Sequence, residues 1–447
     1  MARLFGTDGV RGIANVELTN EIAYRLGQAA VVFLGKTIII GKDTRLSGDM
    51  LESAMVAGIA SAGGTALLAG MVPTPAVALL VNKLNAAGGA VISASHNPPE
   101  YNGIKLFDSQ GYKLPDEVED TIEEFITSGG LEGARGLEGM PQGADLGFCV
   151  DLKDASEIYI AHAVSSIKEQ GIDFTGYSIA IDAGHGASSF TTPEAFRRLG
   201  AEVHVINDDY DGTDINVECG STNLGQLHKF VEEINADIGI AHDGDADRVM
   251  LISPEGDEID GDMMEAVMAL DMKDRGVLAG DTVVTTVMSN LGFTHAMRDA
   301  GISVVQTKVG DRYVLEEMRA KGYSIGGEQS GHMILLDYNS TGDGLMTAVQ
   351  FMGAVKRSGK PVAEAARIMT RFPQELINVR VSDKQAVAEE QAVKDAVAAA
   401  EAELGEDGRV LLRPSGTEPV VRVMVEAKTQ EDAEKHAQAI ASVVEQF

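Results

Sequence analysis

The sequence predicts an α/β fold in which three tandem α/β domains of similar topology precede a small α+β C-terminal domain, and the four domains form a cleft. Three observations predict it. Three stretches repeat one order of elements: a β-rich run, a Gly/Asp/Ser turn, a helical segment and a further apolar run. Each stretch is followed by another apolar run that ends in a polar loop. The tail beyond Phe372 follows a different pattern.

The repeated stretches cover residues 37–70, 177–206 and 281–306. Each has the pattern of a β-α-β unit, which favours parallel strands joined by a helical crossover. The polar loops lie within residues 88–98, 236–248 and 323–332. In open α/β sheets ligands bind beyond the carboxyl ends of the strands, so we expect all three loops at that edge. Tandem β-α-β units are ordinary in α/β proteins, so the function must be inferred from the loop contents.

The tail is expected to form the α+β domain, with one strand, an alanine-rich helix, a pair of strands and a closing helix. Thr429 is the expected N-cap of the closing helix, with Asp432 three residues on. The apolar positions at helical spacing on one face are Ala433, Ala437, Ile440 and Val444. We place the four domains at residues 1–150, 151–253, 254–368 and 369–447.

Composition and charge narrow the class of protein. With 447 residues and 44% hydrophobic composition, the chain is long enough for several packed domains. Its formal net charge of −32 repels nucleic acid and anionic membrane surfaces, so neither is an expected partner. No apolar run approaches the roughly 18–20 residues of a membrane helix and the start lacks a signal-peptide core, so we expect a cytoplasmic protein. Cys149 and Cys219 follow no metal or disulfide spacing and are expected to be free thiols.

Three aspartates alternate in the second polar loop, at Asp243, Asp245 and Asp247. On an extended strand end, alternate side chains point the same way and would converge. Three hard oxygen ligands suit magnesium or calcium. An EF-hand is excluded because its sixth and twelfth positions would be Arg248 and Pro254 rather than glycine and glutamate. A solvated acidic turn is the alternative, but three unpaired carboxylates repel one another and a cation relieves that repulsion.

Ser95 lies in the first polar loop, after a β-rich run and before a pair of prolines that prevents a helix. A loop of small residues here is expected to expose the hydroxyl. Most serines in such loops only cap or solvate the backbone. The neighbouring His96 is more often an ordinary loop histidine than a base. Neither residue identifies a function by itself.

Two further loops carry polar groups, one set suited to a diol and the other to a phosphate. In the third loop Glu328, Ser330 and His332 alternate after two glycines, so the carboxylate and hydroxyl suit a sugar diol, although a polar turn fits equally well. The tail loop offers hydrogen-bond donors for a phosphate dianion, at Arg413, Ser415, Gly416 and Thr417, with Arg422 on the next strand. Such a local group of donors could bind phosphate although the chain as a whole is negatively charged. A hairpin turn with an arginine ion pair is the alternative for the tail loop.

Taken together, these loops resemble the α-D-phosphohexomutase family over the whole chain. The motifs that carry the resemblance are "GTDGVRG" at 6–12, "SASHNPPEYNGIK" at 93–105, "DGDADRV" at 243–249, "VGDRYV" at 309–314, "GGEQSGH" at 326–332 and "RPSGTEP" at 413–419. One departure, "PPEY" where an aromatic residue nearer the proline is expected, puts only the local loop shape in doubt.

The resemblance implies a phosphoserine at Ser95 and a Mg²⁺ ion held by the three aspartates and the serine phosphate. It also implies contacts from Glu328 and Ser330 to sugar hydroxyls, and a non-reacting phosphate on the Arg413 loop. Lys308 and His332 join the expected sugar site. The cations expected to support phosphoryl transfer are Arg11, Arg248 and Lys308. The candidates for moving the hydroxyl proton are Lys105, His96, Arg248 and His332.

Within the family, "GTDGVRG", "VGDRYV" and the chain length are similar to the branch that isomerises glucosamine 6-phosphate to glucosamine 1-phosphate, on the route to UDP-N-acetylglucosamine. A glucosamine or glucose 1,6-bisphosphate would activate the phosphoenzyme. Two alternatives stay open: an enzyme for mannose or glucose phosphates, and a non-catalytic protein that binds sugar phosphates. The intact Ser95 argues against the second, since binding needs no nucleophile. A homodimer is also left open.

Overall fold

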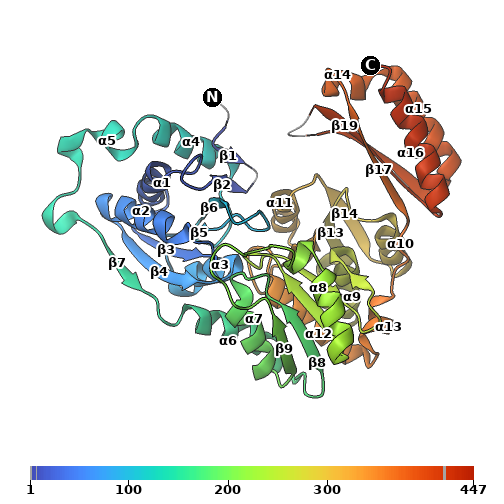
Figure 1. Ribbon diagram of the computed structural model, residues 1–447, viewed down its shortest axis with the longest axis horizontal. Coiled ribbons are helices and arrows are strands. Elements are labelled where there is room, and N and C mark those ends of the chain that lie inside the picture. The colour runs from blue at the N-terminus through green and yellow to red at the C-terminus, as the bar shows by residue number, and fades with distance from the viewer. Residues whose placement is uncertain (1–2, 7, 416–418) are drawn as a thin grey trace. The chain divides into compact units, whose positions relative to one another are not determined.

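The computed structural model describes residues 3–6, 8–415 and 419–447. The chain divides into two compact units, which are Met1–Met288 with Ser303–Arg367, and Ser289–Ile302 with Ile368–Phe447. The first unit contains three sheets and the second contains one (Figure 1).

The first sheet has seven strands in the order β1-β2-β6-β5-β3-β4-β7. These strands are β1 (Phe5–Gly6), β2 (Gly9–Ile13), β3 (Thr37–Lys42), β4 (Thr65–Met71), β5 (Gly88–Ile92), β6 (Tyr101–Phe107) and β7 (Phe148–Asp151). The helices of this part are α1 (Asn20–Phe33), α2 (Gly48–Ser61), α3 (Thr74–Leu84), α4 (Asp116–Thr127) and α5 (Gly130–Arg135). The chain reverses its direction across the sheet after β4, so right-handed crossovers place α2 and α3 on opposite faces (Figure 1).

The second sheet has the order β12-β11-β10-β8-β9 and the third has the order β14-β13-β15-β16. Their strands are β8 (Ser178–Asp182), β9 (Glu202–Ile206), β10 (Ile238–His242), β11 (Val249–Ile252), β12 (Glu258–Ile259), β13 (Thr282–Thr286), β14 (Ser303–Thr307), β15 (Ile325–Gly327) and β16 (Met333–Leu335). The helices between and after these strands are α6 (Ala155–Lys168), α7 (Ser188–Arg198), α8 (Gly225–Ile234), α9 (Gly261–Asp274), α10 (Leu291–Asp299), α11 (Asp311–Lys321), α12 (Gly344–Ser358) and α13 (Val362–Ala366).

The three sheets of the first unit share one core topology. In each, the first strand of a β-α-β unit lies between two parallel partners, as in β4-β3-β5, β9-β8-β10 and β14-β13-β15. An antiparallel strand, β6, β11 or β16, then pairs with the third. Ile38, Ile39 and Ile40 of β3 are all fully buried, as expected for a parallel strand covered on both faces. The predicted repeat of three α/β domains is confirmed.

The second unit contains the small antiparallel sheet β17-β19-β18. Its elements after α13 are β17 (Gln374–Arg380), α14 (Lys384–Glu389), α15 (Gln391–Leu404), β18 (Gly408–Pro414), β19 (Val420–Ala427) and α16 (Gln430–Val444). Thr429 caps α16, because its side chain accepts a hydrogen bond from Asp432 N. The predicted apolar face of α16 is fully buried: Ala433, Ala437, Ile440 and Val444. The tail is therefore the predicted α+β domain.

The described residues also form short 3-10 segments at Leu137–Gly139, Gly143–Asp145, Gly220–Thr222, Ala279–Asp281 and Gly405–Asp407. Among the described residues, no helix has both the length and the apolar character needed to cross a membrane. Cys149 and Cys219 are both free thiols, as predicted. The exact domain boundaries and the cleft between four domains stay predictions.

Candidate active site

Three loops occupy equivalent places in the repeated topology. Each connects the third parallel strand of a sheet to its antiparallel neighbour: β5 to β6, β10 to β11 and β15 to β16. Ser95 lies in the first loop, Asp243 begins the second and Glu328 begins the third. Because these loops start at the carboxyl ends of parallel strands, they lie at the edge where α/β sheets bind ligands.

Ser95 is in direct contact with the first of the aspartates. Its Oγ donates a hydrogen bond to Asp243 Oδ2 at 2.7 Å and lies 3.2 Å from His96 Nδ1. The expectation that the loop exposes this hydroxyl was wrong, because Ser95 is only 1% exposed. Residues from the second sheet's domain cover it, so the serine is part of a buried polar cluster.

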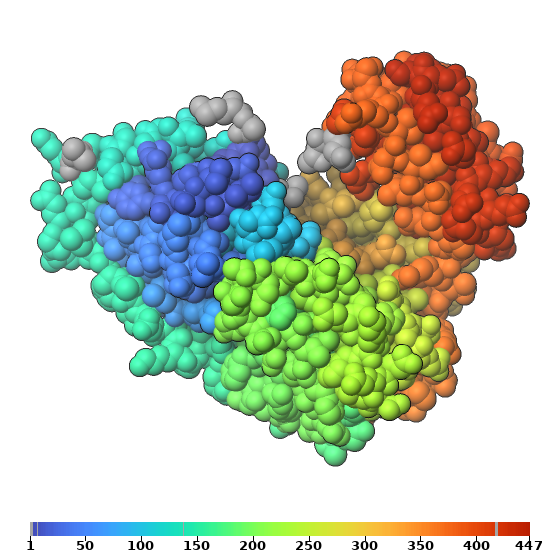
Figure 2. Space-filling view, in the orientation of Figure 1, coloured from blue at the N-terminus to red at the C-terminus, as the bar shows by residue number. Residues whose placement is uncertain are grey.

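The domains of the first and second sheets meet at this serine. On the surface, the light-blue segment of the first domain borders the yellow-green segment of the second (Figure 2). Asn216 Nδ2 donates to Ser95 O at 2.9 Å. In the opposite direction, Thr74 at the start of α3 donates from Oγ1 to Asp245 Oδ2 at 2.6 Å and from its backbone N–H to Asp245 O at 2.9 Å. These bonds join the serine loop and the aspartate loop into one site.

Asp243, Asp245 and Asp247 form a compact buried cluster. They are 0%, 0% and 3% exposed, and one carboxylate oxygen of each lies within 4.8 Å of the others. Among the described residues, Oδ1 of Asp245 and Oδ1 of Asp247 have no hydrogen-bond partner. Buried carboxylate oxygens that accept no hydrogen bond are suited to bind a hard divalent cation. The cluster could therefore hold a metal ion.

The aspartates lie in a tight turn. Residues 243–248 connect β10 to β11, and Ala246 within the turn has φ of 53°. The expectation of an extended strand end was wrong, because the chain reverses directly after His242 so that β11 can pair with β10. The turn itself brings the three carboxylates together.

Two carboxyl groups of the cluster have pKa values shifted in opposite directions. Burial, and then the charges of Asp247 and Asp245, raise the pKa of Asp243 well above its usual value. Burial acts in the same direction on Asp247, but Lys105 and His332 outweigh it and hold the pKa of Asp247 well below the usual range. A bound divalent cation would favour the ionised form of all three carboxylates.

Lys105 is a buried cation of the site. Its Nζ lies 2.9 Å from Asp245 Oδ2, 2.9 Å from Asp8 Oδ2 and 3.5 Å from Asp247 Oδ2, and the residue is 2% exposed. Burial lowers the pKa of Lys105, but these carboxylates outweigh it and raise that pKa well above its ordinary value. Lys105 is therefore charged at neutral pH.

Asp8 is a site residue that the sequence analysis missed. It accepts hydrogen bonds from Arg11 Nη2 at 2.7 Å and from Lys113 Nζ at 2.6 Å, and it also contacts Lys105. Burial raises the pKa of Asp8, but Lys105, Lys113 and Arg11 outweigh it and lower that pKa far below the usual range. Arg11 Nη1 in turn donates to Asn97 Oδ1 at 3.1 Å, which places it beside the serine loop. The available signal was the acidic residue within "GTDGVRG".

His96, Arg248 and His332 lie beside the aspartates. The ring of His332 is between two carboxylates, with Nδ1 3.6 Å from Asp247 Oδ1 and Nε2 3.4 Å from Asp311 Oδ2. Burial lowers the pKa of His332, but these carboxylates outweigh it and raise the pKa. Burial, and then the charge of Arg248, lower the pKa of His96, which favours the neutral form of the ring.

The third loop lies beside the segment that carries Lys308. Gly310 N donates to Glu328 Oε1 at 3.1 Å, which ties the two segments together. Glu328 is partly buried, while Ser330 and Lys308 are exposed. His332 turns instead toward the buried aspartates and is 2% exposed. The sugar-binding roles of these residues stay predictions.

The predicted phosphate loop belongs to the second unit. Arg413 on β18 is directly opposite Arg422 on β19, so the two side chains share one face of the sheet. Burial, and then the charge of Arg422, lower the pKa of Arg413. Ser415 is buried, whereas Gly416 and Thr417 lie outside the described residues.

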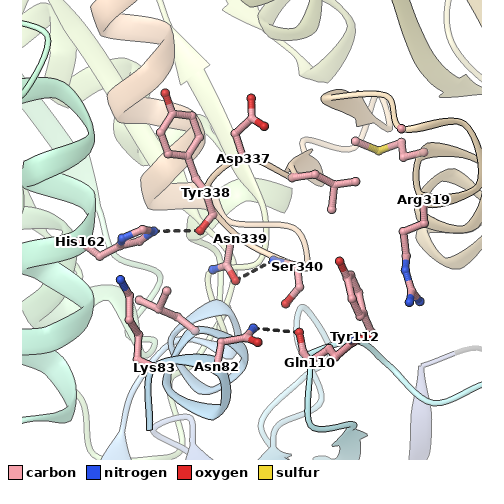
Figure 3. Close-up of a pocket in the computed structure, with 14 residues that line it drawn as sticks. Asn82, Lys83, Gln110, Tyr112, His162, Arg319, Asp337, Tyr338, Asn339 and Ser340 are labelled. Atoms are coloured by element: carbon pink, nitrogen blue, oxygen red, sulfur yellow. Dashed lines mark hydrogen bonds between the residues drawn. The ribbon is translucent and has the colours of Figure 1, made fainter. Parts of the chain in front are cut away.

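A pocket of about 720 Å³, whose lining includes none of the three aspartates, is shown in Figure 3. It lies between α3, α6, α11 and the loops around Gln110 and Tyr338. In it, His162 Nε2 is 2.8 Å from Tyr338 O, and Asn82 Nδ2 donates to Gln110 O at 2.8 Å (Figure 3). None of the predicted site residues that the structure describes lines this pocket.

Comparisons with known proteins identify the family. The sequence matches the phosphoglucomutase/phosphomannomutase models for alpha/beta/alpha domain I over residues 2–132, domain II over 157–256, domain III over 260–372 and the C-terminal domain over 376–443. A phosphoglucosamine mutase of Ruminiclostridium cellulolyticum is 49% identical over 453 residues, which cover 100% of this chain and 99% of the relative. The chain belongs to the α-D-phosphohexomutase family. The predicted resemblance is thereby confirmed over the whole length.

Solved structures share the fold of this phosphohexomutase. A phosphoglucomutase/phosphomannomutase family protein of Burkholderia thailandensis has a TM-score of 0.81 at 24% identity, covering 98% of both chains. An N-acetylphosphoglucosamine mutase of Aspergillus fumigatus, in complex with GlcNAc-6P and magnesium, has a TM-score of 0.70 at 16% identity, covering 99% of this chain and 95% of that one. At these identities the likeness concerns the fold, which is the predicted set of three α/β domains and a C-terminal domain.

Proposed function

We propose that this phosphohexomutase interconverts glucosamine 6-phosphate and glucosamine 1-phosphate through a phosphorylated Ser95. The contact between Ser95 Oγ and Asp243 Oδ2, 2.7 Å long and within a cluster of three buried carboxylates, carries the proposal. A serine that only caps a loop has no need of such a cluster beside it. The choice of glucosamine is supported by the full-length identity to a phosphoglucosamine mutase.

The reaction conserves phosphate. Phospho-Ser95 gives its phosphoryl group to the O1 hydroxyl of glucosamine 6-phosphate, so that the P–Oγ bond breaks, a P–O1 bond forms and the hydroxyl proton moves to a base. The base passes this proton to Ser95 Oγ. The resulting 1,6-bisphosphate then reorients, and Ser95 Oγ takes the O6 phosphoryl group, so that the P–O6 bond breaks, a P–Oγ bond forms and the Oγ proton passes to O6, which leaves glucosamine 1-phosphate. A glucosamine or glucose 1,6-bisphosphate would rephosphorylate an enzyme that has lost its phosphate.

Asp243, Asp245 and Asp247, together with the phosphate on Ser95, would hold Mg²⁺, which when bound neutralises charge on the transferring phosphoryl group. Lys105 adds a fixed positive charge 2.9 Å from Asp245 Oδ2. Phosphoryl transfer depends mainly on such positioning and charge neutralisation. The proposed supporting cations are Lys105, Arg11, Arg248 and Lys308.

His96 is the best supported of the four proton-transfer candidates. Lys105 and Arg248 stay charged, and the pKa of His332 is raised after the opposing effect of burial. The pKa of His96 is lowered instead, by burial and then by Arg248, so a neutral ring is available 3.2 Å from Ser95 Oγ. A neutral imidazole within hydrogen-bond reach of Ser95 Oγ, one of the reacting oxygens, meets both requirements of a general base for the transfer back to Ser95.

Substrate recognition is assigned to the remaining predicted residues. The proposed contacts to sugar hydroxyls come from Lys308, Glu328, Ser330 and His332. The proposed contacts to the non-reacting phosphate come from Arg413, Ser415, Gly416, Thr417 and Arg422. Two arginines directly opposite on one sheet face repel each other, and a phosphate dianion between them would remove that cost.

An assay of kcat/KM on glucosamine, glucose, mannose and N-acetylglucosamine 6-phosphates tests the substrate. We expect the highest value for glucosamine 6-phosphate. An equal or higher value for the glucose or mannose compound would assign the chain to another branch of the family and leave the phosphoserine chemistry standing. The intact mass of purified protein tests the covalent step separately, because a phosphoenzyme carries a fractional addition of one phosphate. A cytoplasmic location and the oligomeric state remain parts of the proposal to be measured.

A further inference from the structure

The guanidinium of Arg45 lies buried beneath the serine loop. Arg45 follows β3, and its side chain is 0% exposed, as is the side chain of Asp43. Arg45 Nε donates to Asp43 Oδ2 at 2.9 Å, and Arg45 N donates to Asp43 Oδ1 at 3.0 Å. The Asp43 carboxylate therefore fixes the orientation of the guanidinium plane.

The other four N–H groups of this guanidinium are directed at carbonyls of the serine loop. Nη2 donates to Ser95 O at 3.0 Å and to Asn97 O at 2.8 Å. Nη1 donates to Tyr101 O at 2.9 Å and also to Pro98 O. An arginine has five N–H donors in a rigid planar fork, and all five are used here. The loop from Ser95 to Tyr101 is thus wrapped around one side chain.

The same pair of residues also holds the amide side of Ser95. Ser95 N donates to Ser93 Oγ at 2.9 Å, and Ser93 Oγ donates to Asp43 Oδ2 at 2.6 Å. Ser95 has φ of 52°, in the left-handed region that costs free energy for a residue with a side chain. Such a conformation persists only where its surroundings determine it from several sides. Here Arg45 of the Asp43–Arg45 pair holds the carbonyl directly, together with Asn216, and Asp43 holds the amide through Ser93.

We propose that Arg45 is a positioning residue for phosphoryl transfer, because it holds Ser95 in the left-handed conformation that aims Oγ at Asp243 Oδ2, 2.7 Å away. Within the part of the chain that the structure describes, no hydrogen bond or ion pair joins Arg45 to the cluster of carboxylates, and Arg45 acts through the backbone of Ser95. Without it, the backbone relaxes to the ordinary φ < 0 and the Cα–Cβ bond turns away from Asp243. This inference rests on the proposed phosphoserine reaction.

Arg45→Lys keeps the positive charge but leaves three donors without the planar fork, so it cannot satisfy one carboxylate and four carbonyls. We expect kcat to fall about a hundredfold, the size of effect that a misplacement of about 1 Å produces, while KM stays within about twofold. Ser93→Ala removes only one hydroxyl and should lower kcat in the same way. If Arg45→Lys does not fold, the kcat of Ser93→Ala decides whether the positioning proposal holds. Arg25→Lys is the matched control, because Arg25 also donates to a carbonyl, Ile126 O at 2.8 Å, but far from the serine loop in sequence and on α1.

Three measurements separate positioning from mere support of the fold. Single-turnover transfer from a 1,6-bisphosphate to Ser95, followed by intact mass, should slow in parallel with kcat in Arg45→Lys and Ser93→Ala. A crystal structure of either variant should show Ser95 at φ < 0. The shift in melting temperature of each variant should not correlate with its loss in kcat.

A kcat within about threefold of wild type in both variants would overturn the proposal, whatever their melting temperatures. A rise in KM with kcat preserved would overturn it as well, since positioning of the nucleophile affects the chemical step. Failure of the proposed function is distinguishable from either outcome. In that case the wild-type enzyme itself takes no phosphate on Ser95 and turns over none of the four sugar phosphates.

Discussion

Replacing Lys105 by methionine tests whether the aspartate cluster binds a divalent cation, with stability as the readout. The substitution keeps the length and apolar stem of the side chain and removes the ammonium. Asp245 then loses the hydrogen bond from Lys105 Nζ, and the hydroxyl of Thr74 is its remaining side-chain hydrogen-bond donor among the described residues. Asp8 keeps its contacts to Arg11 and Lys113, at 2.7 and 2.6 Å, so the main loss falls on Asp245.

The magnitude follows from the contact distance and the burial of both partners. At 2.9 Å and an effective dielectric constant of about 20, one such pair attracts by roughly 6 kcal/mol before desolvation is subtracted. Removing one partner of a buried pair usually costs about 3–5 kcal/mol, because the other charge is left buried. For a large domain, that corresponds to a drop of about 6–20 °C in apparent Tm.

Calorimetry in EDTA and in saturating MgCl₂ measures this drop, using the same transition in both proteins because a multidomain chain does not unfold in one step. Bound Mg²⁺ would supply the positive charge that Lys105→Met lacks, so we expect magnesium to raise the Tm of the variant more than that of the wild type. Lys83→Met is the control: Lys83 is exposed in the same domain, and its loss should change stability by less than about 0.5 kcal/mol. Equal magnesium shifts in Lys105→Met and the wild type would refute the reasoning.

Four other predictions concern single residues. Ser95→Ala should abolish phosphate incorporation and nearly all mutase activity while the fold survives, measured by intact mass, turnover and circular dichroism; near-normal turnover would rule out the covalent route. Asp245→Asn should weaken magnesium binding, because one of three anionic ligands is lost, and activity should partly recover at high magnesium; an unchanged magnesium titration would place the metal elsewhere. Arg413→Ala should raise KM and lower kcat, at a cost of about 1.5–3 kcal/mol or roughly tenfold to more than a hundredfold in kcat/KM; unchanged kinetics would leave its loop a plain hairpin. A thiol reagent should label exposed Cys149 in the native protein and spare buried Cys219, whose pKa burial raises to about 12, so labelling of both before unfolding would contradict the structure.

The repeated topology could be predicted because its signals are local. A run such as Ile38–Ile40, a glycine turn and a helix of about 14 residues define one β-α-β unit within a short stretch of chain. The geometry of the aspartate loop had no such local signal. Alternating aspartates fit an extended strand and a turn equally well, and the pairing of β11 with β10 decides between them.

The burial of Ser95 could not be predicted for a related reason. Its local sequence of small residues indicates an exposed loop, but the groups that cover it come from another domain. Asp243 is 148 positions away and Asn216 is 121 positions away in the chain. The apparent freedom of a loop thus depends on contacts that a reading of neighbouring residues does not contain.

The same dependence on distant contacts explains why the sequence predicted cations at the site but not all the acidic residues that pair with them. The chain has 68 acidic residues against 36 basic ones, so almost any lysine has an acidic neighbour in sequence and none of these neighbours stands out. Lys113 pairs instead with Asp8 and with Asp311, which lies 198 positions further on. A lysine buried between two carboxylates keeps its charge, because burial disfavours the ammonium and the carboxylates outweigh that effect. In an acidic protein with the proposed phosphate-ester substrate, fixed cations of this kind have to be held within the fold, and the acidic residues that hold them belong to the site as much as the cations do.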